Sequence, residues 1–151
     1  MKIYLDTEFN SFQGDLISIG MVSETGVTFY AVRLATIKMD IDPWVQEWVM
    51  PHLHKAPHTV IYAEDKLIQL RLQEYLCGWG DIELEIIADW PEDIQHLTKL
   101  LITGPGEMIT TPDVVRYTVD RNLCGLSEVP HNAIFDAIGN WQADKIFDGA
   151  G

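Results

Sequence analysis

The chain has 151 residues, of which 47% are hydrophobic and 22% charged, and its formal net charge is −13 at pH 7. This length can bury a core of its own, and no apolar run approaches the roughly 20 residues that a membrane-spanning helix needs. We therefore expect a single domain, residues 1–151, with no membrane partner. A cytoplasmic location is expected because charged residues interrupt the N-terminus before an export signal could form.

The acidity bears directly on whether the chain can bind nucleic acid. Affinity for a phosphate backbone normally comes from Lys and Arg, and the ten such residues form no run here. Carboxylates that hold divalent cations would change the sign of the local field, so nucleic-acid binding should depend on metal. The alternative interpretation is that the acidity serves solubility alone.

Three strands are predicted near the N-terminus, over residues 2–8, 16–23 and 27–34. These segments are rich in Ile, Val, Tyr and Phe, and the turn signals Gly14-Asp15 and Thr25-Gly26 separate them. Because the connections are short, the three strands should form an antiparallel meander.

Helices are predicted in the central part of the chain. One begins at Pro43 and carries Trp44 and Trp48, which the apolar spacing favours as core residues. Another is expected over residues 64–77, and Gly78 ends it. Residues 84–88 then form a short apolar run of strand type.

The last third of the chain alternates between element types. Pro91 suits the first turn of a helix that runs through residue 102, and residues 103–112 are expected to be a loop. Residues 114–119 fit a strand or a helix about equally well. A final helix over residues 133–147 follows Asn132 as its N-cap. The order of elements predicts an α/β fold with a mixed five-stranded sheet flanked by helices.

A pair of carboxylates ends the first predicted strand. Side chains two apart on a strand point to the same face, so Asp6 and Glu8 should project together. Hard divalent cations prefer such oxygen ligands, and two of them about 4 Å apart can stabilise a phosphoryl displacement. The spacing alone is a weak signal, because D-x-E recurs at Asp81 and Glu83.

Two further carboxylates compete for a place in the same site. Asp93 lies in the first turn of the helix that Pro91 begins, next to its apolar stripe, and should point toward the sheet. Asp89 ends the preceding strand. Each also has a structural interpretation, since acidic residues in a first turn stabilise the helix dipole and Asp89 could cap the helix.

The segment from His131 to Asp136 contributes a histidine and another carboxylate. Ala133, Asp136 and Ala137 form a small or polar stripe that lets the last helix approach the sheet closely. His131 lies in the loop just before that helix. An imidazole there suits a general base, because imidazoles titrate near neutral pH.

Together these residues resemble the DEDDh superfamily of 3'-5' exonucleases. YLDTEF is similar to its first motif, IIADWPEDIQHL to its second and HNAIFDA to its third, in the same order along the chain. The opening DTEF, followed by LISIGMVSETGVTFYAV and WV…MPHL, resembles most the small branch typified by RNase AS. The resemblance covers most of the chain, but residues 103–127 match no pattern of the family.

The resemblance implies an RNase H-like fold and a hydrolase that releases nucleoside 5'-monophosphates from single-stranded 3' ends, RNA rather than DNA. It also implies two Mg²⁺ or Mn²⁺ ions, and often a homodimer. Asp6, Glu8, Asp93 and Asp136 would be the metal ligands and His131 the base, while Phe9 could stack on a terminal base. Alternatives are a non-catalytic nucleic-acid-binding or regulatory module on the same fold, a DNA 3'-5' exonuclease, and a metal-free carboxylate-pair hydrolase of sugars.

Overall fold

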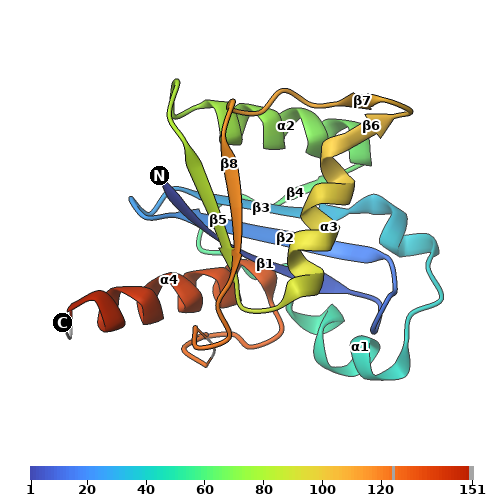
Figure 1. Cartoon of the computed structure of the whole chain (residues 1–151). Coiled ribbons are helices and arrows are strands. Elements are labelled where there is room, and N and C mark those ends of the chain that lie inside the picture. The colour runs from blue at the N-terminus through green and yellow to red at the C-terminus, as the bar shows by residue number, and fades with distance from the viewer. Residues whose placement is uncertain (124, 150–151) are drawn as a thin grey trace.

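The computed structural model describes residues 1–123 and 125–149, so residues 124, 150 and 151 of the expected domain lie outside the described part. Its centre is a six-stranded mixed sheet in the order β4-β3-β2-β1-β5-β8 (Figure 1). The strands are β1 (Lys2–Phe9), β2 (Leu16–Ser23), β3 (Thr28–Arg33), β4 (Ile61–Ala63), β5 (Leu84–Ala88) and β8 (Val115–Val119).

The directions of the strands follow from the lengths of their connections. β1, β2 and β3 pair antiparallel, which confirms the predicted meander. β5 pairs parallel with β1, β8 with β5, and β4 with β3, as expected where longer segments cross between strands. The arrangement is an α/β fold that is compatible with an RNase H-like fold.

The sequence-based strand count was one too low. β4 has only three residues, too few to show an alternating pattern in the sequence. It is a strand because it pairs with β3. The expected loop over residues 103–112 instead contains part of a small hairpin, β6 (Ile102–Gly104) with β7 (Glu107–Met108). Residues 115–119 are a strand rather than a helix.

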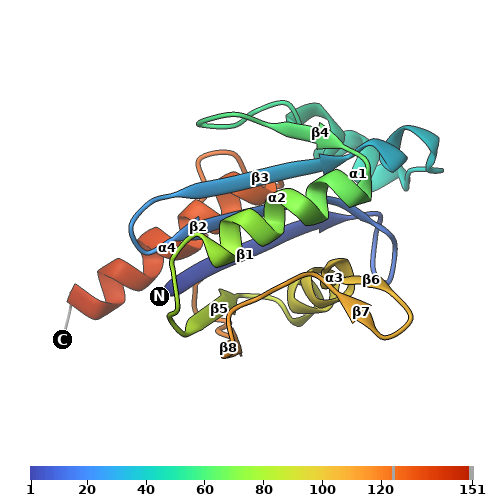
Figure 2. The same ribbon diagram turned by 90° about the horizontal axis from the view of Figure 1, so that it is seen from above.

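Helices cover both faces of the sheet (Figures 1 and 2). On one face, α2 and α3 pack against β1–β3 and β5 around an apolar cluster that includes Ile3 and Leu5. On the other face, α1 and α4 pack in two smaller clusters that include Tyr4 and Tyr30. The helices are α1 (Pro43–Trp48), α2 (Asp65–Cys77), α3 (Pro91–Leu101) and α4 (Ala133–Gly149), with 3-10 turns at Leu34–Lys38 and Met50–His52.

The tryptophans of α1 depart from the sequence-based prediction. Trp44 and Trp48 are 51% and 47% exposed, whereas Val45 and Val49 fill the core position. The six-residue helix buries only Val45, and Val49, its C-cap residue, packs in the same apolar cluster. In the described residues, no helix combines the length and apolar character needed to cross a membrane.

Candidate active site

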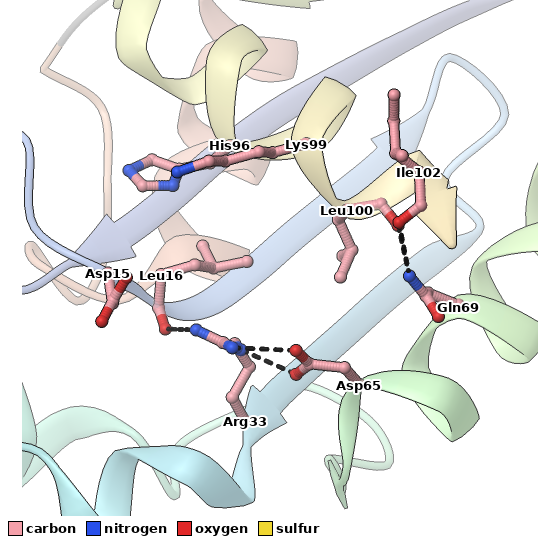
Figure 3. Close-up of a pocket in the computed structure, with 9 residues that line it drawn as sticks. All are labelled: Asp15, Leu16, Arg33, Asp65, Gln69, His96, Lys99, Leu100 and Ile102. Carbon is pink, nitrogen blue, oxygen red and sulfur yellow. Dashed lines mark hydrogen bonds and ion pairs between the residues drawn. The ribbon is translucent and has the colours of Figure 1, made fainter. Parts of the chain in front are cut away.

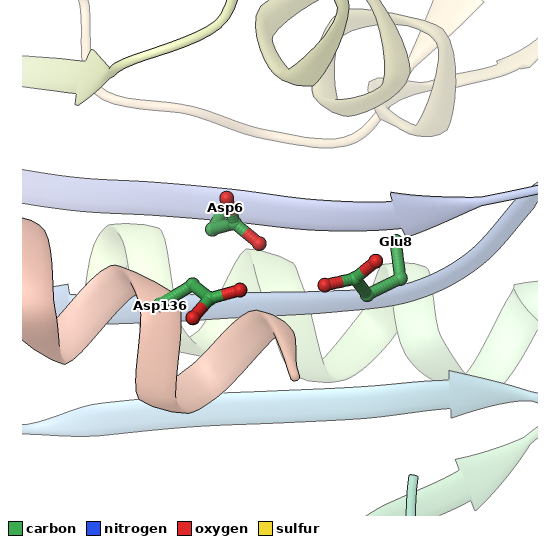
Figure 4. A group of neighbouring side chains, drawn as sticks. All are labelled: Asp6, Glu8 and Asp136. Atoms are coloured by element: carbon green, nitrogen blue, oxygen red, sulfur yellow. The ribbon is translucent and has the colours of Figure 1, made fainter. Parts of the chain in front are cut away.

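Three carboxylates meet on the α4 face of the sheet. Asp6 and Glu8 alternate along β1 with buried Thr7, so they share a face as the D-x-E spacing predicts. Asp136, from the first turns of α4, points between them (Figure 4). One carboxylate oxygen from each of the three lies within 4.8 Å of the others.

Close packing at the start of α4 brings Asp136 to the strand. Gly20 of β2 lies opposite Asp6, and a Cβ atom added there would lie 2.4 Å from the carbonyl oxygen of Ala133. Asn132 caps the helix as predicted, because its Oδ1 accepts from the backbone N–H groups of Ile134 and Phe135. Its side-chain nitrogen also donates to the carbonyls of residues 52 and 55, at 2.7 and 2.9 Å.

A second group of carboxylates shares Asp6 with the first. Asp6, Asp89 and Asp93 also place one oxygen each within 4.8 Å of the others. Asp93 is 2% exposed, and its Oδ1 accepts from both the backbone N–H and the hydroxyl of Thr7, at 3.1 and 2.6 Å. Asp89 accepts from the side-chain nitrogen of Asn140 on α4 at 3.2 Å. The sequence left open whether Asp89 or Asp93 joins the site, and the structure places both beside Asp6.

His131 lies beside the same carboxylates in an uncommon backbone conformation. Its φ is +64°, in the left-handed region, and its backbone N–H donates to Oδ2 of Asp136 at 3.0 Å. Its ring and that of Trp44 lie nearly perpendicular, with ring centroids 5.0 Å apart. The histidine is therefore fixed at the carboxylates by its own backbone and by an aromatic neighbour.

The crowding of these acids disfavours their ionised forms. Burial raises the pKa of Asp6 well above its ordinary range, and the charges of Asp93, Glu8, Asp136 and Asp89 raise it further. Burial raises the pKa of Asp93 to about 7, against the opposing effect of its bonds from Thr7. Burial is likewise the largest cause of the raised pKa of Glu8 and of Asp136.

Two buried oxygens indicate what could relieve this repulsion. Oδ2 of Asp6 and Oδ2 of Asp93 are buried, and neither has a hydrogen-bond partner among the residues that the structure describes. A buried carboxylate oxygen without a donor is costly. A divalent cation would satisfy both oxygens and reverse the sign of the local potential, so the donor set fits hard metal ions.

Two adjoining pockets lie at the carboxylates. The first, called the carboxylate pocket, has a volume of about 380 Å³ and is lined by Asp6, Thr7, Glu8, Phe9, Phe12, Asp89, Trp90, Asp93, His131 and Asp136. The second, called the aromatic pocket, measures about 390 Å³ and is lined by Thr7, Glu8, Phe9, Ser11, Phe12, Asp42, Trp44, Val45 and His131. The two pockets share Thr7, Glu8, Phe9, Phe12 and His131, so the aromatic pocket opens directly beside the carboxylates.

All six site residues that were singled out in the sequence line the carboxylate pocket: Asp6, Glu8, Phe9, Asp93, His131 and Asp136. Phe9 is half-buried and packs on His96, with ring centroids 4.8 Å apart. Sequence reasoning missed Phe12 and assigned Trp44 to the core. Two local signals indicated that these aromatic side chains are exposed. Phe12 lies in a turn, and Trp44 follows Pro43 at the start of a helix.

Comparisons with known proteins agree with this chemistry. No family model matches the chain. Over 120 residues, however, the chain is 32% identical to a 3'-5' exoribonuclease of Mycobacterium tuberculosis strain H37Rv, a match that spans 78% of this chain and 70% of the relative. The 3'-5' exoribonuclease of strain CDC 1551 matches to the same extent. The chain belongs to this family of 3'-5' exoribonucleases.

The acidic site of this exoribonuclease family member should make its stability depend on pH and metal together. The pKa of Asp93 is about 7 in the folded protein and 3.8 ordinarily, so the folded state holds a proton that the unfolded chain releases. The resulting stability is complete below about pH 4 and is lost as the pH rises through about 7. Between about pH 4 and pH 7, we expect the melting temperature of EDTA-treated wild type to fall further than that of EDTA-treated Asp93→Asn.

The control is the same pair of proteins with Mn²⁺ at the upper end of this pH range. A cation that binds only the folded state stabilises it, so Mn²⁺ should raise the melting temperature of wild type more than that of Asp93→Asn. The asparagine keeps the oxygen that accepts from Thr7, which limits the change to the charge. Parallel melting curves at every pH, with and without Mn²⁺, would contradict this account.

Proposed function

We propose that the chain is a DEDDh-type 3'-5' exoribonuclease with an RNase H-like fold, residues 1–151 acting as one domain. It removes nucleoside 5'-monophosphates from the 3' end of single-stranded RNA. The observation that carries the proposal is that Asp6 belongs to two carboxylate clusters at once, one with Glu8 and Asp136 and one with Asp89 and Asp93. A shared carboxylate between two ligand sets is the arrangement that two-metal phosphoryl transfer needs.

The roles of the residues follow from this arrangement. Asp6, Glu8, Asp93 and Asp136, with Asp89 beside them, would hold two Mg²⁺ or Mn²⁺ ions. Such ions, when bound, supply stabilisation of the charge that develops on the attacking and leaving oxygens. His131 accepts the proton of the attacking water as the water oxygen bonds to phosphorus. The bond between phosphorus and the 3' oxygen of the shortened strand breaks, that oxygen takes up a proton from solvent to become the new 3' hydroxyl, and the terminal nucleotide departs as its 5'-monophosphate.

The aromatic pocket suits the terminal nucleobase. Phe9 and Phe12 line both pockets, and Trp44 closes the aromatic pocket on the side of His131. Aromatic side chains stack on any base, at roughly 1–3 kcal/mol per base. We therefore propose Phe9 as a substrate-binding residue, with Phe12 and Trp44 beside it. A terminal base bound there would bring the 3' terminal phosphodiester over the carboxylates.

The function is tested by incubating the purified protein with 5'-labelled single-stranded RNA, or DNA of the same sequence, in Mg²⁺, Mn²⁺ or EDTA. We expect a ladder of products that shorten from the 3' end of the RNA, slower shortening of DNA, and none in EDTA. Faster degradation of the DNA would favour a DNA exonuclease. Intact RNA and DNA in every lane, with folded protein, would leave the non-catalytic binding module as the better interpretation.

The same protein preparation tests the remaining expectations. Light scattering after size exclusion measures whether the chain forms the homodimer that the family resemblance implies. Calorimetry with Mn²⁺ tests the number of ions, because two clusters that share Asp6 should bind two ions with coupled affinities. A site that bound no ion while the protein still cleaved its substrate would overturn the two-metal mechanism.

A further inference from the structure

An exoribonuclease with a net charge of −13 has few cations to spare for RNA. Within residues 1–123 and 125–149, four of its ten Lys and Arg side chains are in ion pairs with carboxylates: Lys2, Arg33, Arg71 and Arg116. Arg33 illustrates the point in Figure 3, where its guanidinium donates to both oxygens of Asp65 and to the carbonyl of Leu16. The cavity that contains Arg33 therefore offers little net positive charge to a phosphate.

Arg121 differs from these cations because its partner is an aromatic ring and not a carboxylate. Its guanidinium carbon lies 4.3 Å from the centroid of the Trp90 ring, and the side chain forms no ion pair with a carboxylate in the part of the chain that the structure describes. A guanidinium stacked on an indole face keeps its N–H donors at the edge of the plane, where they can meet a phosphate in bidentate geometry. Arg121 is also exposed to solvent.

The backbone fixes Arg121 beside the catalytic carboxylates. The N–H of Asp120 donates to the carbonyl of Ala88 at 2.8 Å, so the turn after β8 is bound to the end of β5. That end of β5 leads directly into Asp89 and Trp90. Oδ1 of Asp120 in turn accepts from the backbone and side chain of Asn122, both at 3.0 Å, which closes the turn around Arg121.

Trp90 also indicates where the strand leaves the site. It lines the carboxylate pocket but not the aromatic pocket. It lines a further depression of about 570 Å³, shared with Gln13, Gln95 and Lys99. If the terminal base occupies the aromatic pocket, the upstream strand can pass over Trp90 toward this depression, and its backbone then passes Arg121.

We infer that Arg121, held on the face of Trp90, binds the RNA phosphate immediately upstream of the scissile one. The inference rests on the proposed function, since it requires an RNA 3' end in the carboxylate pocket. Arg121 is then a substrate-binding residue in the segment that matches no pattern of the DEDDh family. It adds a positive charge at the edge of the carboxylate pocket, which is lined by five acidic side chains.

The test compares Arg121→Gln with Arg116→Gln. Both variants lose one positive charge, but Arg116 lies at the start of β8, at the end of that strand away from Arg121, and forms an ion pair with Glu83. Initial rates are measured in Mn²⁺ over a range of KCl concentrations, on a single-stranded RNA oligonucleotide and on a dinucleotide. The dinucleotide contains the scissile phosphate and lacks the upstream one.

For the oligonucleotide, Arg121→Gln should raise KM about tenfold and leave kcat nearly unchanged, because one charge-assisted contact is lost. The dependence of log(1/KM) on log[KCl] should become shallower by about 0.7, the value for one phosphate contact on a single strand. For the dinucleotide, KM should equal that of wild type. Arg121→Lys should recover the salt dependence but only part of the affinity, since lysine cannot stack on Trp90 as arginine does.

Each other outcome is decisive. If Arg121→Gln behaves as Arg116→Gln on the oligonucleotide, or raises KM equally for the dinucleotide, the inference is wrong and the proposed function stands. If wild type cleaves neither substrate, the proposed function is wrong and the inference falls with it. Should Arg121→Gln fail to fold, as judged by its melting temperature, the salt dependence and KM of Arg121→Lys decide the question alone.

Discussion

Replacing Asp6 by asparagine is expected to reduce exoribonuclease activity by about 10⁴-fold, since each metal ion contributes several kcal/mol to the transition state. Asp6 belongs to both carboxylate clusters, so its loss should weaken the binding of both ions, whereas loss of Glu8 or Asp89 should weaken one. The measurement is the initial rate of RNA shortening in saturating Mn²⁺. Activity within tenfold of wild type would show that the two clusters do not act through Asp6.

The same substitution should have the opposite effect on stability. In the metal-free protein, burial and the four neighbouring carboxylates raise the pKa of Asp6, so its ionised form is unfavourable. An asparagine removes that charge at nearly constant volume. The melting temperature of Asp6→Asn in EDTA should therefore lie above that of wild type near neutral pH, while Mn²⁺ should raise it less.

Asp81→Asn is the matched control for both measurements. Asp81 and Glu83 repeat the D-x-E spacing, but Asp81 is exposed and belongs to neither carboxylate cluster among the described residues. It should leave both the activity and the response to Mn²⁺ close to those of wild type. A loss of activity comparable to that of Asp6→Asn would mean that general charge, not the cluster, is responsible.

The parts of the site that the sequence predicted are the ones set by local geometry. The alternation of a strand places Asp6 and Glu8 on one face, and the cap at Asn132 fixes the start of α4, so both could be inferred from short segments. The close approach of α4 also had a local signal, in the small residues around Asp136. Its counterpart, Gly20 on β2, shows its role only when the two elements are seen in contact.

The remaining features depend on contacts between segments far apart in the chain. From the sequence, Asp93 and Asp89 are competing candidates for one ligand position. In the structure, Thr7 of β1 donates to Asp93 and Asn140 of α4 donates to Asp89, and both carboxylates lie near Asp6. Periodicity cannot reveal such partners. The stacking of Arg121 on Trp90 likewise joins residues 31 positions apart, in a segment without a recognisable motif.

Replacing His131 by alanine is expected to lower kcat by about 10²–10⁴-fold, the range of a general base. The carboxylates that hold the metal ions remain in place, so KM for RNA and the binding of Mn²⁺ should change little. The measurement is kcat and KM for single-stranded RNA in Mn²⁺, together with calorimetry. An equal loss of metal binding would assign His131 to the ligand set instead.

The backbone of His131 requires a second variant, because its φ of +64° is a conformation that alanine adopts less readily than asparagine does. In that conformation the N–H of residue 131 donates to Asp136, so a relaxed loop could displace a metal ligand and imitate the loss of a base. His131→Asn tolerates the left-handed conformation and has no basic nitrogen. If the imidazole is the base, both variants lose the same factor in kcat; if the loop geometry is the cause, His131→Asn retains most of the activity.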